Sequence, residues 1–567
     1  MSLGAILKYW RTARHLRTVQ IIGQLRNRLR PIWENPQRFA AEHTPPPYAG
    51  CHWRLRASFP SPLPRLLDAG QIQQGRLTFL NQTHDLGWPP DWQPQEASKL
   101  WLYNLHYFDW LWALDFPQAR EAALDWIERY PLRAAVDGWE PYPVSLRLMN
   151  WCGCFLDRFR RETEADPDFL QSLWGSVSLQ TEWLMRHLEY HLLGNHLLEN
   201  AAALTIAGSC FAGDQAREWR ARGLRILTDQ IPEQILPDGM HFERSPMYHL
   251  RIAYLLLVLR NIDDDGVYTA VQEPLPRVLQ AARMLAHPDG EIALFNDSAQ
   301  NVYPAPSRLQ DMAESILGAS AISSAEDDLN GFWSLPDAGY YGWRGENGEY
   351  LIIDAGAIGP DYQPGHAHGD IFSYELSWRG TRLIVDSGVC TYEPGAMRQY
   401  LRSTQAHNTI EINGQDQCEF WGAFRTAHRG MPRDVECFPS ATGFRLSGWH
   451  DGYERLPGAP RHRREFHWDA ASGLQVKDRI VSKRPVRIVS RIHLHPDCRV
   501  MESGKNAFDI ICPSGKAVIQ FEGDGAAYIN DGQYGLEFNK LFKMKTLAFH
   551  GEGRRMDSDY IVSLKKN

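Results

Sequence analysis

The spacing of apolar residues changes part-way along the chain, near Leu335. Before this point, apolar side chains recur at the spacing of helices that bury one face, most clearly in residues 98–114, 172–193, 194–208 and 245–260. Beyond Gly339 the chain consists of short runs rich in β-branched and aromatic residues, separated by turn-forming residues, which predict antiparallel strands. We therefore expect an α+β multidomain protein, helical first and β-rich second.

This pattern predicts three regions. Residues 1–95 hold a basic segment and then proline-rich stretches, which indicate an irregular approach to the helical domain. The successive helices of residues 96–335 indicate a toroid or solenoid, and the strands of residues 336–567 indicate a β-sandwich. A chain of 567 residues is too long for one core, which agrees with this division.

Hydropathy and charge argue against two classes of protein. No apolar run approaches the roughly 18 residues of a membrane span. The net charge of −8 argues against a protein that binds nucleic acid.

Residues 1–32 are an exception to the acidic balance, because no acidic residue precedes Glu34. Together with Ile21, Ile22 and Leu25, the basic residues predict an amphipathic helix. Such a helix either contacts an anionic membrane surface peripherally or packs on the body by its apolar side. The basic residues are Lys8, Arg11, Arg14, Arg17, Arg26, Arg28 and Arg30.

Two features bear on the compartment. Residues 1–32 lack the continuous apolar region of a secretory signal. The nine cysteines are scattered, as expected for buried thiols in a reducing environment. We expect a cytoplasmic protein, membrane-peripheral if residues 1–32 bind lipid.

Residues 371–386 predict a β-hairpin with one apolar face. A two-residue turn after Trp378 pairs that residue with Thr381 and sets Leu376 opposite Leu383. Both Leu376 and Leu383 are apolar, which supports this register.

The same register ends the hairpin at Asp386, where His368 enters, so the two side chains can meet. His407 begins a later strand and adds a second imidazole. Two imidazoles and a carboxylate suit a Zn²⁺ or Mn²⁺ shell. A structural hydrogen bond between His and Asp is the simpler interpretation, and His493 with His495 forms a competing cluster.

Two predicted helix starts carry polar residues. Asn195, His196 and Glu199 share one face of the first, although an ordinary polar first turn has the same pattern. In the second, Ser245 suits the N-cap, so Tyr248 falls at the third helical position, where the helix dipole favours a phenolate. Arg244 would act in the same direction; a buried Tyr that anchors the helix is the alternative.

Seven motifs, in order along the chain, together resemble the heparinase II/III family of polysaccharide lyases. They span residues 104–414, more than half of the chain. The basic start and the aromatic first motif look like the branch associated with bacterial surface-polysaccharide synthesis. The motifs are NLHYFDWL, GWEPYPVSLRLMNW, GNHLLENA, DGMHFERSPMY, GHAHGDIFSYEL, RLIVDSG and RSTQAHNTIEING.

The resemblance implies an (α/α) toroid followed by an antiparallel β-sandwich, with the active cleft between them. It also implies β-elimination at a uronic acid in an acidic polysaccharide. A base removes the C5 proton, the C6 carboxylate is neutralised, and an acid reaches O4 as the C4–O4 bond breaks.

Site residues follow from the resemblance by position. Asn195 with His196 matches the carboxylate neutraliser, Tyr248 the base, acid or both, and His366 the second catalytic group. Glu199 matches a carboxylate behind them. The metal shell, which is structural, holds Zn²⁺, with Mn²⁺ or Ca²⁺ as alternatives. Its ligands match His368, Asp386 and His407, and candidate clamps for the acidic polymer are Arg147, Arg244 and Arg402, each with a structural ion pair as the alternative role.

Two other functions are consistent with these residues. A uronate C5-epimerase shares the first proton abstraction and then reprotonates the opposite face. A non-catalytic polysaccharide-binding or assembly protein needs no set of acid and base groups, so the combination of Asn, Tyr and His argues against it. The sequence does not distinguish lyase from epimerase, nor does it identify the polymer or the oligomeric state.

Overall fold

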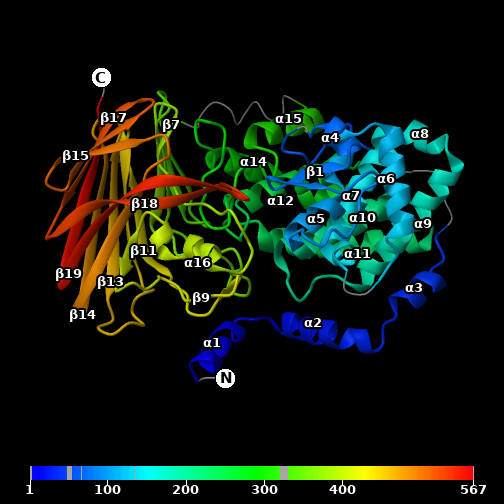
Figure 1. Ribbon diagram of the computed structural model, residues 1–567, viewed down its shortest axis with the longest axis horizontal. Helices are drawn as coiled ribbons and strands as arrows, with labels where there is room; N and C mark the ends of the chain where they lie inside the picture. Colours follow the sequence, from blue (N-terminus) through cyan, green and yellow to red (C-terminus); the bar gives the residue numbers. More distant parts are fainter. Residues whose placement is uncertain (1–2, 47–53, 66, 134–135, 319–329, 566–567) are drawn as a thin grey trace.

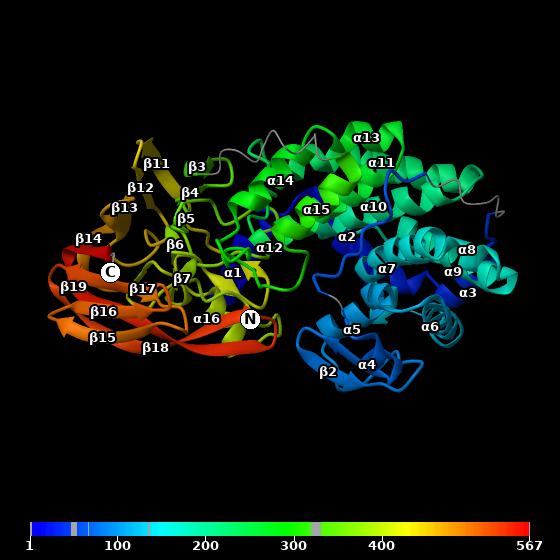
Figure 2. The same cartoon turned by 90° about the horizontal axis from the view of Figure 1, so that it is seen from above.

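The protein is described by a computed structural model, which covers residues 3–46, 54–65, 67–133, 136–318 and 330–565 (Figure 1). A helical half and a β-sheet half lie side by side along the long axis (Figures 1 and 2). The predicted fold class, a helical toroid followed by an antiparallel β-sandwich, is confirmed.

The helical half is built around two buried helices, α10 (Gly194–Cys210) and α12 (Pro246–Asn261), which carry few exposed side chains. Small residues let its helices approach closely: a Cβ on Gly208 of α10 would lie 2.5 Å from the Arg220 backbone nitrogen. The surrounding helices are α5 (Lys99–Tyr107), α6 (Phe116–Arg129), α7 (Pro141–Gly153), α8 (Arg160–Glu164), α9 (Pro167–Arg186), α11 (Asp214–Gln234), α13 (Asp265–Val271), α14 (Leu275–Met284) and α15 (Pro306–Leu317).

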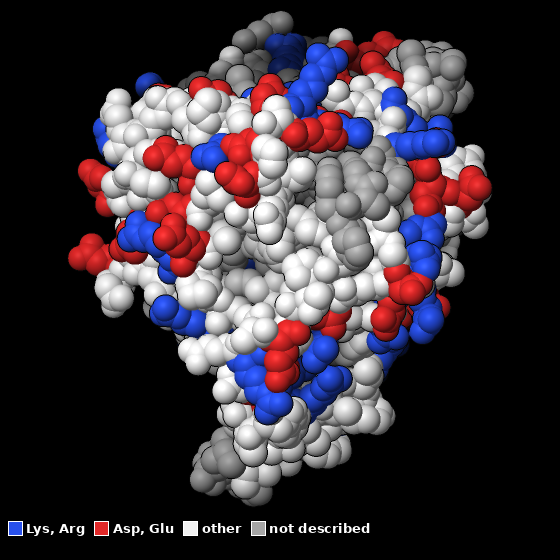
Figure 3. All heavy atoms as spheres, turned by 90° about the vertical axis from the view of Figure 1, so that its right-hand side faces the viewer, with Lys and Arg blue, Asp and Glu red and all other residues white. Residues whose placement is uncertain are grey.

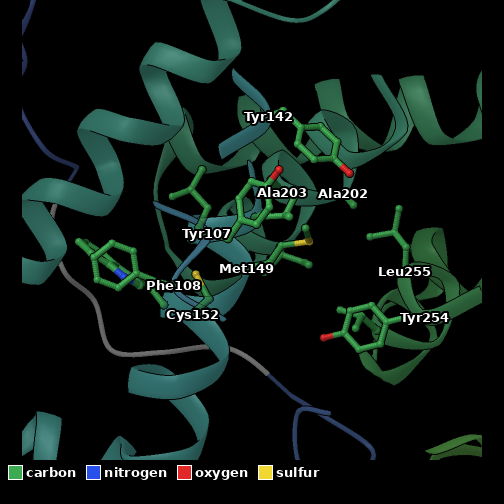
Figure 4. Close-up of a cluster of buried hydrophobic side chains, with 14 of the residues drawn as sticks. Tyr107, Phe108, Tyr142, Met149, Cys152, Ala202, Ala203, Tyr254 and Leu255 are labelled. Carbon is green, nitrogen blue, oxygen red and sulfur yellow. The ribbon is translucent and has the colours of Figure 1, made fainter. Parts of the chain in front are cut away.

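Aromatic and small side chains pack together inside this half. Figure 4 shows rings from α5, α7 and α12 around the alanines of α10. The first turns of α10 and α12 lie against the sheet half, since a Cβ on Gly194 would overlap the Gln363 side chain and the Tyr248 ring contacts that of His366.

The sheet half contains two antiparallel sheets that enclose a shared core. Five strands form the first, in the order β3 (Gly331–Leu335), β4 (Tyr340–Arg344), β5 (Tyr350–Asp354), β6 (Ser373–Trp378) and β7 (Thr381–Ile384). Its first strand begins at Gly331, ahead of the boundary predicted at residue 336.

The second sheet has ten strands. Apolar side chains of both sheets, such as Leu376 and Phe466, form one cluster between them. The strands are β8 (Ile410–Ile412), β11 (Pro432–Pro439), β12 (Gly443–His450), β13 (Arg461–Asp469), β14 (Gly473–His493), β15 (Arg499–Gly504), β16 (Ala507–Cys512), β17 (Gly515–Glu522), β18 (Gly525–Glu537) and β19 (Lys540–Lys565).

The β6–β7 hairpin agrees with the predicted turn but not with the whole register. Trp378 pairs with Thr381, and the turn between them has positive φ values of 50° and 77°. A bulge after Leu376 then pairs that residue with Ile384 instead of Leu383. The hairpin end is displaced accordingly, which changes the surroundings of Asp386.

The N-terminal region is more ordered than predicted. It contains α1 (Leu3–Ala13), α2 (Thr18–Leu29) and α3 (Pro36–Glu42), which run along the outside of both halves, then α4 (Ala69–Gln73) and a small hairpin of β1 (Arg76–Phe79) and β2 (Gln82–Asp85) (Figure 1). The described helices include none long and apolar enough to cross a membrane. The eight described cysteines are free thiols, and Cys51 lies outside the described residues.

Candidate active site

Tyr248 lies in the first turn of α12, as predicted. The Ser245 hydroxyl caps the helix by accepting from the Tyr248 backbone N–H at 3.2 Å, and Pro246 is the first helical residue. The Tyr248 side chain is half-buried, and its hydroxyl lies 3.2 Å from that of Tyr392. The sequence therefore fixes the position of this phenol through a local capping motif.

His366 reaches the same place from the sheet half. It lies on the loop between β5 and β6, and its ring centroid is 4.0 Å from that of Tyr248. The His366 side chain is 11% exposed, so it remains open to a ligand. A phenol and an imidazole from the two halves thus meet at their boundary.

A buried carboxylate, Asp297, orients His366. Its Oδ2 lies 2.9 Å from His366 Nδ1, and its Oδ1 lies 2.9 Å from His368 Nε2. The Arg398 guanidinium of α16 (Ala396–Arg402) donates to both carboxylate oxygens. Burial alone would raise the pKa of Asp297, but Arg398 and the two imidazoles hold it well below its usual range. The anion is therefore permanent and fixes both rings.

The Asn195 amide is committed to a neighbouring carboxylate. Its Nδ2 donates to both oxygens of Glu243 at 3.0 and 3.1 Å, and its backbone N–H donates to Oε1 at 3.0 Å. Glu243 also lies 3.4 Å from His366 Nε2. Burial opposes ionisation, yet His241, His366 and these hydrogen bonds lower the pKa of Glu243.

His196 offers a second nitrogen donor beside Asn195. Its Nδ1 lies 3.0 Å from Glu189 Oε1, and its side chain is 28% exposed. Burial works against the imidazolium, but the Glu189 carboxylate outweighs it and raises the pKa of His196. The raised pKa favours the imidazolium, whose other ring nitrogen is placed to donate to a ligand.

The expectation that the helix start favours a Tyr248 phenolate is wrong. Burial, followed by the neighbouring hydroxyls of Tyr392 and Tyr303, raises the pKa of Tyr248 well above its ordinary value. Arg244 gives no help because its guanidinium donates to the carbonyls of Ala357 and Asp337. The phenol is therefore a proton donor in the resting protein.

Two of the expected substrate-binding residues are instead buried structural groups. Glu199 is fully buried and pairs with Arg251, with contacts of 2.5 and 2.9 Å. Arg147 is also fully buried; it donates to Gln180 and stacks 4.1 Å from the Trp126 ring. Burial lowers the pKa of Arg147 to about 9, since no described carboxylate pairs with it.

The other two expected clamps support loops. Arg402 is buried and donates to the carbonyls of Ala367 and Ala423, which steadies the loop of His366. Arg244, at a positive φ of 56°, connects the start of α12 to the sheet half by donating to the carbonyls of Ala357 and Asp337. Neither points its charge toward a ligand.

One group of described residues can hold a metal ion: His368, Asp370 and His407, whose ligand atoms lie within 4.8 Å of one another. Two nitrogens, His368 Nδ1 and His407 Nε2, are buried and have no hydrogen-bond partner among the described residues. Asp297 holds the other nitrogen of His368, and Asp386 holds that of His407 at 2.8 Å. Imidazoles backed by carboxylates in this way are typical of metal ligands.

The expected third ligand, Asp386, is therefore replaced by Asp370. The bulge in the hairpin places the Asp386 carboxylate behind His407, where it orients the ring rather than facing His368. The competing pair is separate from this group: the His493 ring donates from Nδ1 to Asn408 Oδ1 at 3.0 Å, and His495 lies 3.6 Å from Asp497.

Four important residues were missed by the sequence analysis. Asp370 lies two residues after the predicted ligand His368, in HGD, and Glu243 lies within the quoted DGMHFERSPMY motif, so both could have been considered. Asp297 and Arg398 lie in segments with no motif that indicates chemistry. Only the fold brings these two residues to His366.

The family models agree with this architecture. The model described as "Heparinase II/III N-terminus" matches residues 119–314, and "Heparinase II/III-like, C-terminal" matches residues 327–563. A crystal structure of heparinase III superposes with a TM-score of 0.70 at 18% identity, over 85% of this chain and 80% of that one. At this identity the likeness shows the fold alone.

Two curated relatives differ in how much of their length is matched. The heparin-sulfate lyase of Pedobacter heparinus is 26% identical over 60% of this chain and 55% of its own. This chain spans about half the length of the heparin-sulfate lyases that it matches. FtsZ-localized protein C of Caulobacter vibrioides is 25% identical over 84% of this chain and 86% of its own. Since the two models together cover most of both halves, the chain belongs to the heparinase II/III family.

Proposed function

We propose that this chain is a polysaccharide lyase that cleaves a uronic-acid-containing polymer by β-elimination. The observation that supports it most is the contact between Tyr248 and His366, 4.0 Å between ring centroids, with His366 held by the buried anion of Asp297. A binding surface has no need for an imidazole fixed by a carboxylate beside a half-buried phenol. Such a pair suits proton transfer.

The surroundings of the two groups suggest separate roles. A phenol whose pKa is raised by burial is suited to donate its proton to the leaving O4. Since Asp297 accepts from the N–H at Nδ1, Nε2 of His366 is the nitrogen that would take the C5 proton, and the Glu243 carboxylate 3.4 Å away would stabilise the resulting imidazolium. We therefore assign His366 as the base and Tyr248 as the acid.

Neutralisation of the substrate carboxylate falls to His196 in this proposal. The N–H groups of Asn195 already donate to Glu243, whereas the half-buried His196 ring has a second nitrogen that no contact between described residues occupies. A charge-assisted hydrogen bond to the C6 carboxylate would lower the cost of removing the C5 proton. Asn195 then acts by holding Glu243 beside His366.

A divalent cation would be held by His368, Asp370 and His407. The two unpartnered ring nitrogens fit Zn²⁺ or Mn²⁺ better than Ca²⁺, which prefers oxygen ligands. The cation would supply a cross-link between the loop of His366 and the start of β8. The protein residues alone perform the proton transfers.

A non-catalytic assembly protein is the second candidate. The relative matched over most of both chains is named for its localisation with FtsZ, not for a reaction. In addition, the side-chain amide of Asn195, which was expected to meet a uronate, already donates to Glu243. Figure 3 shows basic and acidic side chains interspersed over the far end of the helical half, so this face offers a polyanion no continuous basic path toward the site.

Tyr248→Phe tests the proposed acid. We expect turnover on a uronate polymer, followed by the ultraviolet absorbance of the unsaturated product, to fall about a hundredfold or more while polymer binding is largely retained. The matched control is Tyr528→Phe, which changes a 52% exposed tyrosine of β18 and should leave turnover unchanged.

The same experiment separates the alternatives. Incorporation of solvent deuterium at C5 without an absorbing product would indicate an epimerase instead of a lyase. Binding without any reaction across a panel of uronate polymers would indicate the assembly protein. Full turnover by Tyr248→Phe would contradict the role given to the phenol.

The pH dependence of binding tests the role of His196. Because its pKa is raised, the imidazolium prevails at lower pH, so affinity for the polymer should fall as the pH rises through that pKa. His196→Gln should weaken binding about tenfold and flatten this dependence, as measured by titration calorimetry. His550→Gln, which alters an exposed histidine of β19, is the control. An unchanged pH profile in His196→Gln would exclude this role.

Metal analysis tests the histidine and aspartate group. Protein supplied with Zn²⁺ or Mn²⁺ should retain about one equivalent by mass spectrometry, and a chelator should lower its melting temperature. Asp370→Asn should abolish retention, and Asp386→Asn should weaken it about 10- to 100-fold by releasing His407. His495→Gln should have no effect. Equal retention by wild type and Asp370→Asn would show that the metal binds elsewhere.

A further inference from the structure

The N-terminal arm, residues 3–33, crosses from the sheet half to the helical half on the outside of the protein (Figure 1). At the sheet end, Arg11 pairs with Glu419, and the Trp421 indole N–H donates to Thr12. At the start of α2, Arg17 pairs with Glu233 of the helical half. The arm is thus attached to both halves by polar contacts.

The middle of the arm is attached in the same way. Gln20, 2% exposed, donates through Nε2 to the carbonyls of Tyr362 and Leu192, which belong to the two different halves. Arg17 lies over the Tyr362 ring at 3.8 Å. The face of the arm that meets the protein is therefore largely polar, apart from the Tyr9 ring, whose centroid lies 4.8 Å from that of Trp421.

The apolar side of the arm faces outward, so the alternative in which it packs on the body is wrong. In α2, Ile22 and Leu25 are 58% and 55% exposed, and Trp10 and Trp33 are 59% and 61% exposed at either end of the arm. A soluble helix normally buries such a stripe. The exposed apolar residues are Ile6, Leu7, Tyr9, Trp10, Val19, Ile21, Ile22, Leu25, Leu29, Ile32 and Trp33.

Positive charge accompanies this stripe. Arg14, Arg26 and Arg28 are exposed on the arm, and no acidic residue occurs before Glu34 in a chain whose net charge is −8. Arginine beside exposed tryptophan and aliphatic residues is the composition of helices that lie in the interface of an anionic bilayer. Tryptophan is enriched at that depth because its ring is amphipathic.

We propose that the arm docks on an anionic lipid bilayer, with α1 and α2 parallel to the surface and their apolar side chains inserted between the headgroups. Charge complementarity favours this occupant over a second copy of the chain, because two such arms would bring like charges together. The polar contacts to Glu233, Glu419 and Tyr362 remain in place, so docking requires no unfolding of the arm.

Vesicle sedimentation with the full chain tests this proposal. The protein should pellet with vesicles of phosphatidylcholine and phosphatidylglycerol and remain in the supernatant with phosphatidylcholine alone, and added salt should weaken binding. Ile22→Ser with Leu25→Ser should lower the partition coefficient about tenfold or more. Arg26→Gln with Arg28→Gln should lower it roughly tenfold.

A matched control changes apolar residues of equal exposure elsewhere: Phe438→Ser with Met501→Ser, 50% and 51% exposed on β11 and β15, should bind as the unaltered protein does. All variants should keep the melting temperature, since these side chains are exposed. Failure of the folded protein to bind anionic vesicles, or binding by both arm variants as strong as that of the unaltered protein, would overturn the proposal. So would a dimer that Ile22→Ser with Leu25→Ser converts to a monomer, because the arm would then be covered by a second copy.

Discussion

One buried carboxylate connects the parts of the site. Asp297 lies between α14 and α15 in the helical half, yet its oxygens meet His366, His368 and Arg398, which all belong to the sheet half. Taking this anion out of water is costly, and the Arg398 guanidinium offsets that cost through two hydrogen bonds. The Asp297 carbonyl also accepts from the Ser245 hydroxyl, which caps the helix of Tyr248. The positions of the phenol and the imidazole are thus set by one group.

The site exists only where the halves meet. The position of Tyr248 depends on the helix cap, and that of His366 depends on Asp297. Asp297 also holds Nε2 of His368, so the buried, unpartnered Nδ1 of that ring faces Asp370 and His407. The N-terminal arm also bridges the halves, and Gln20 holds the carbonyl of Tyr362 shortly before His366 in the chain. The arm is therefore attached to the same loop that carries His366.

Much of the fold and part of the site could be predicted from local sequence patterns. The change in apolar spacing gave the order of the two architectures, and the Ser245–Pro246 pair placed Tyr248 at the right helical position. The bulge after Leu376 lay beyond such rules, and with it the exchange of Asp386 for Asp370. Long-range partners were also inaccessible: Arg251 removes Glu199 from the site, and Asp297 lies far from His366 in sequence. Burial decided the charge state of Tyr248 against the helix dipole, and burial is a property of the fold.

The central claim is that Tyr248 and His366 act on one uronate ring at the boundary of the halves. The most direct measurement is a crystal structure of Tyr248→Phe bound to a uronate oligosaccharide. The account predicts the C5 carbon within about 3.5 Å of His366 Nε2, with O4 beside the ring at position 248 and the carboxylate at His196. A sugar bound away from His366, or with its C5 hydrogen pointing away from Nε2 and toward no other base, would contradict it.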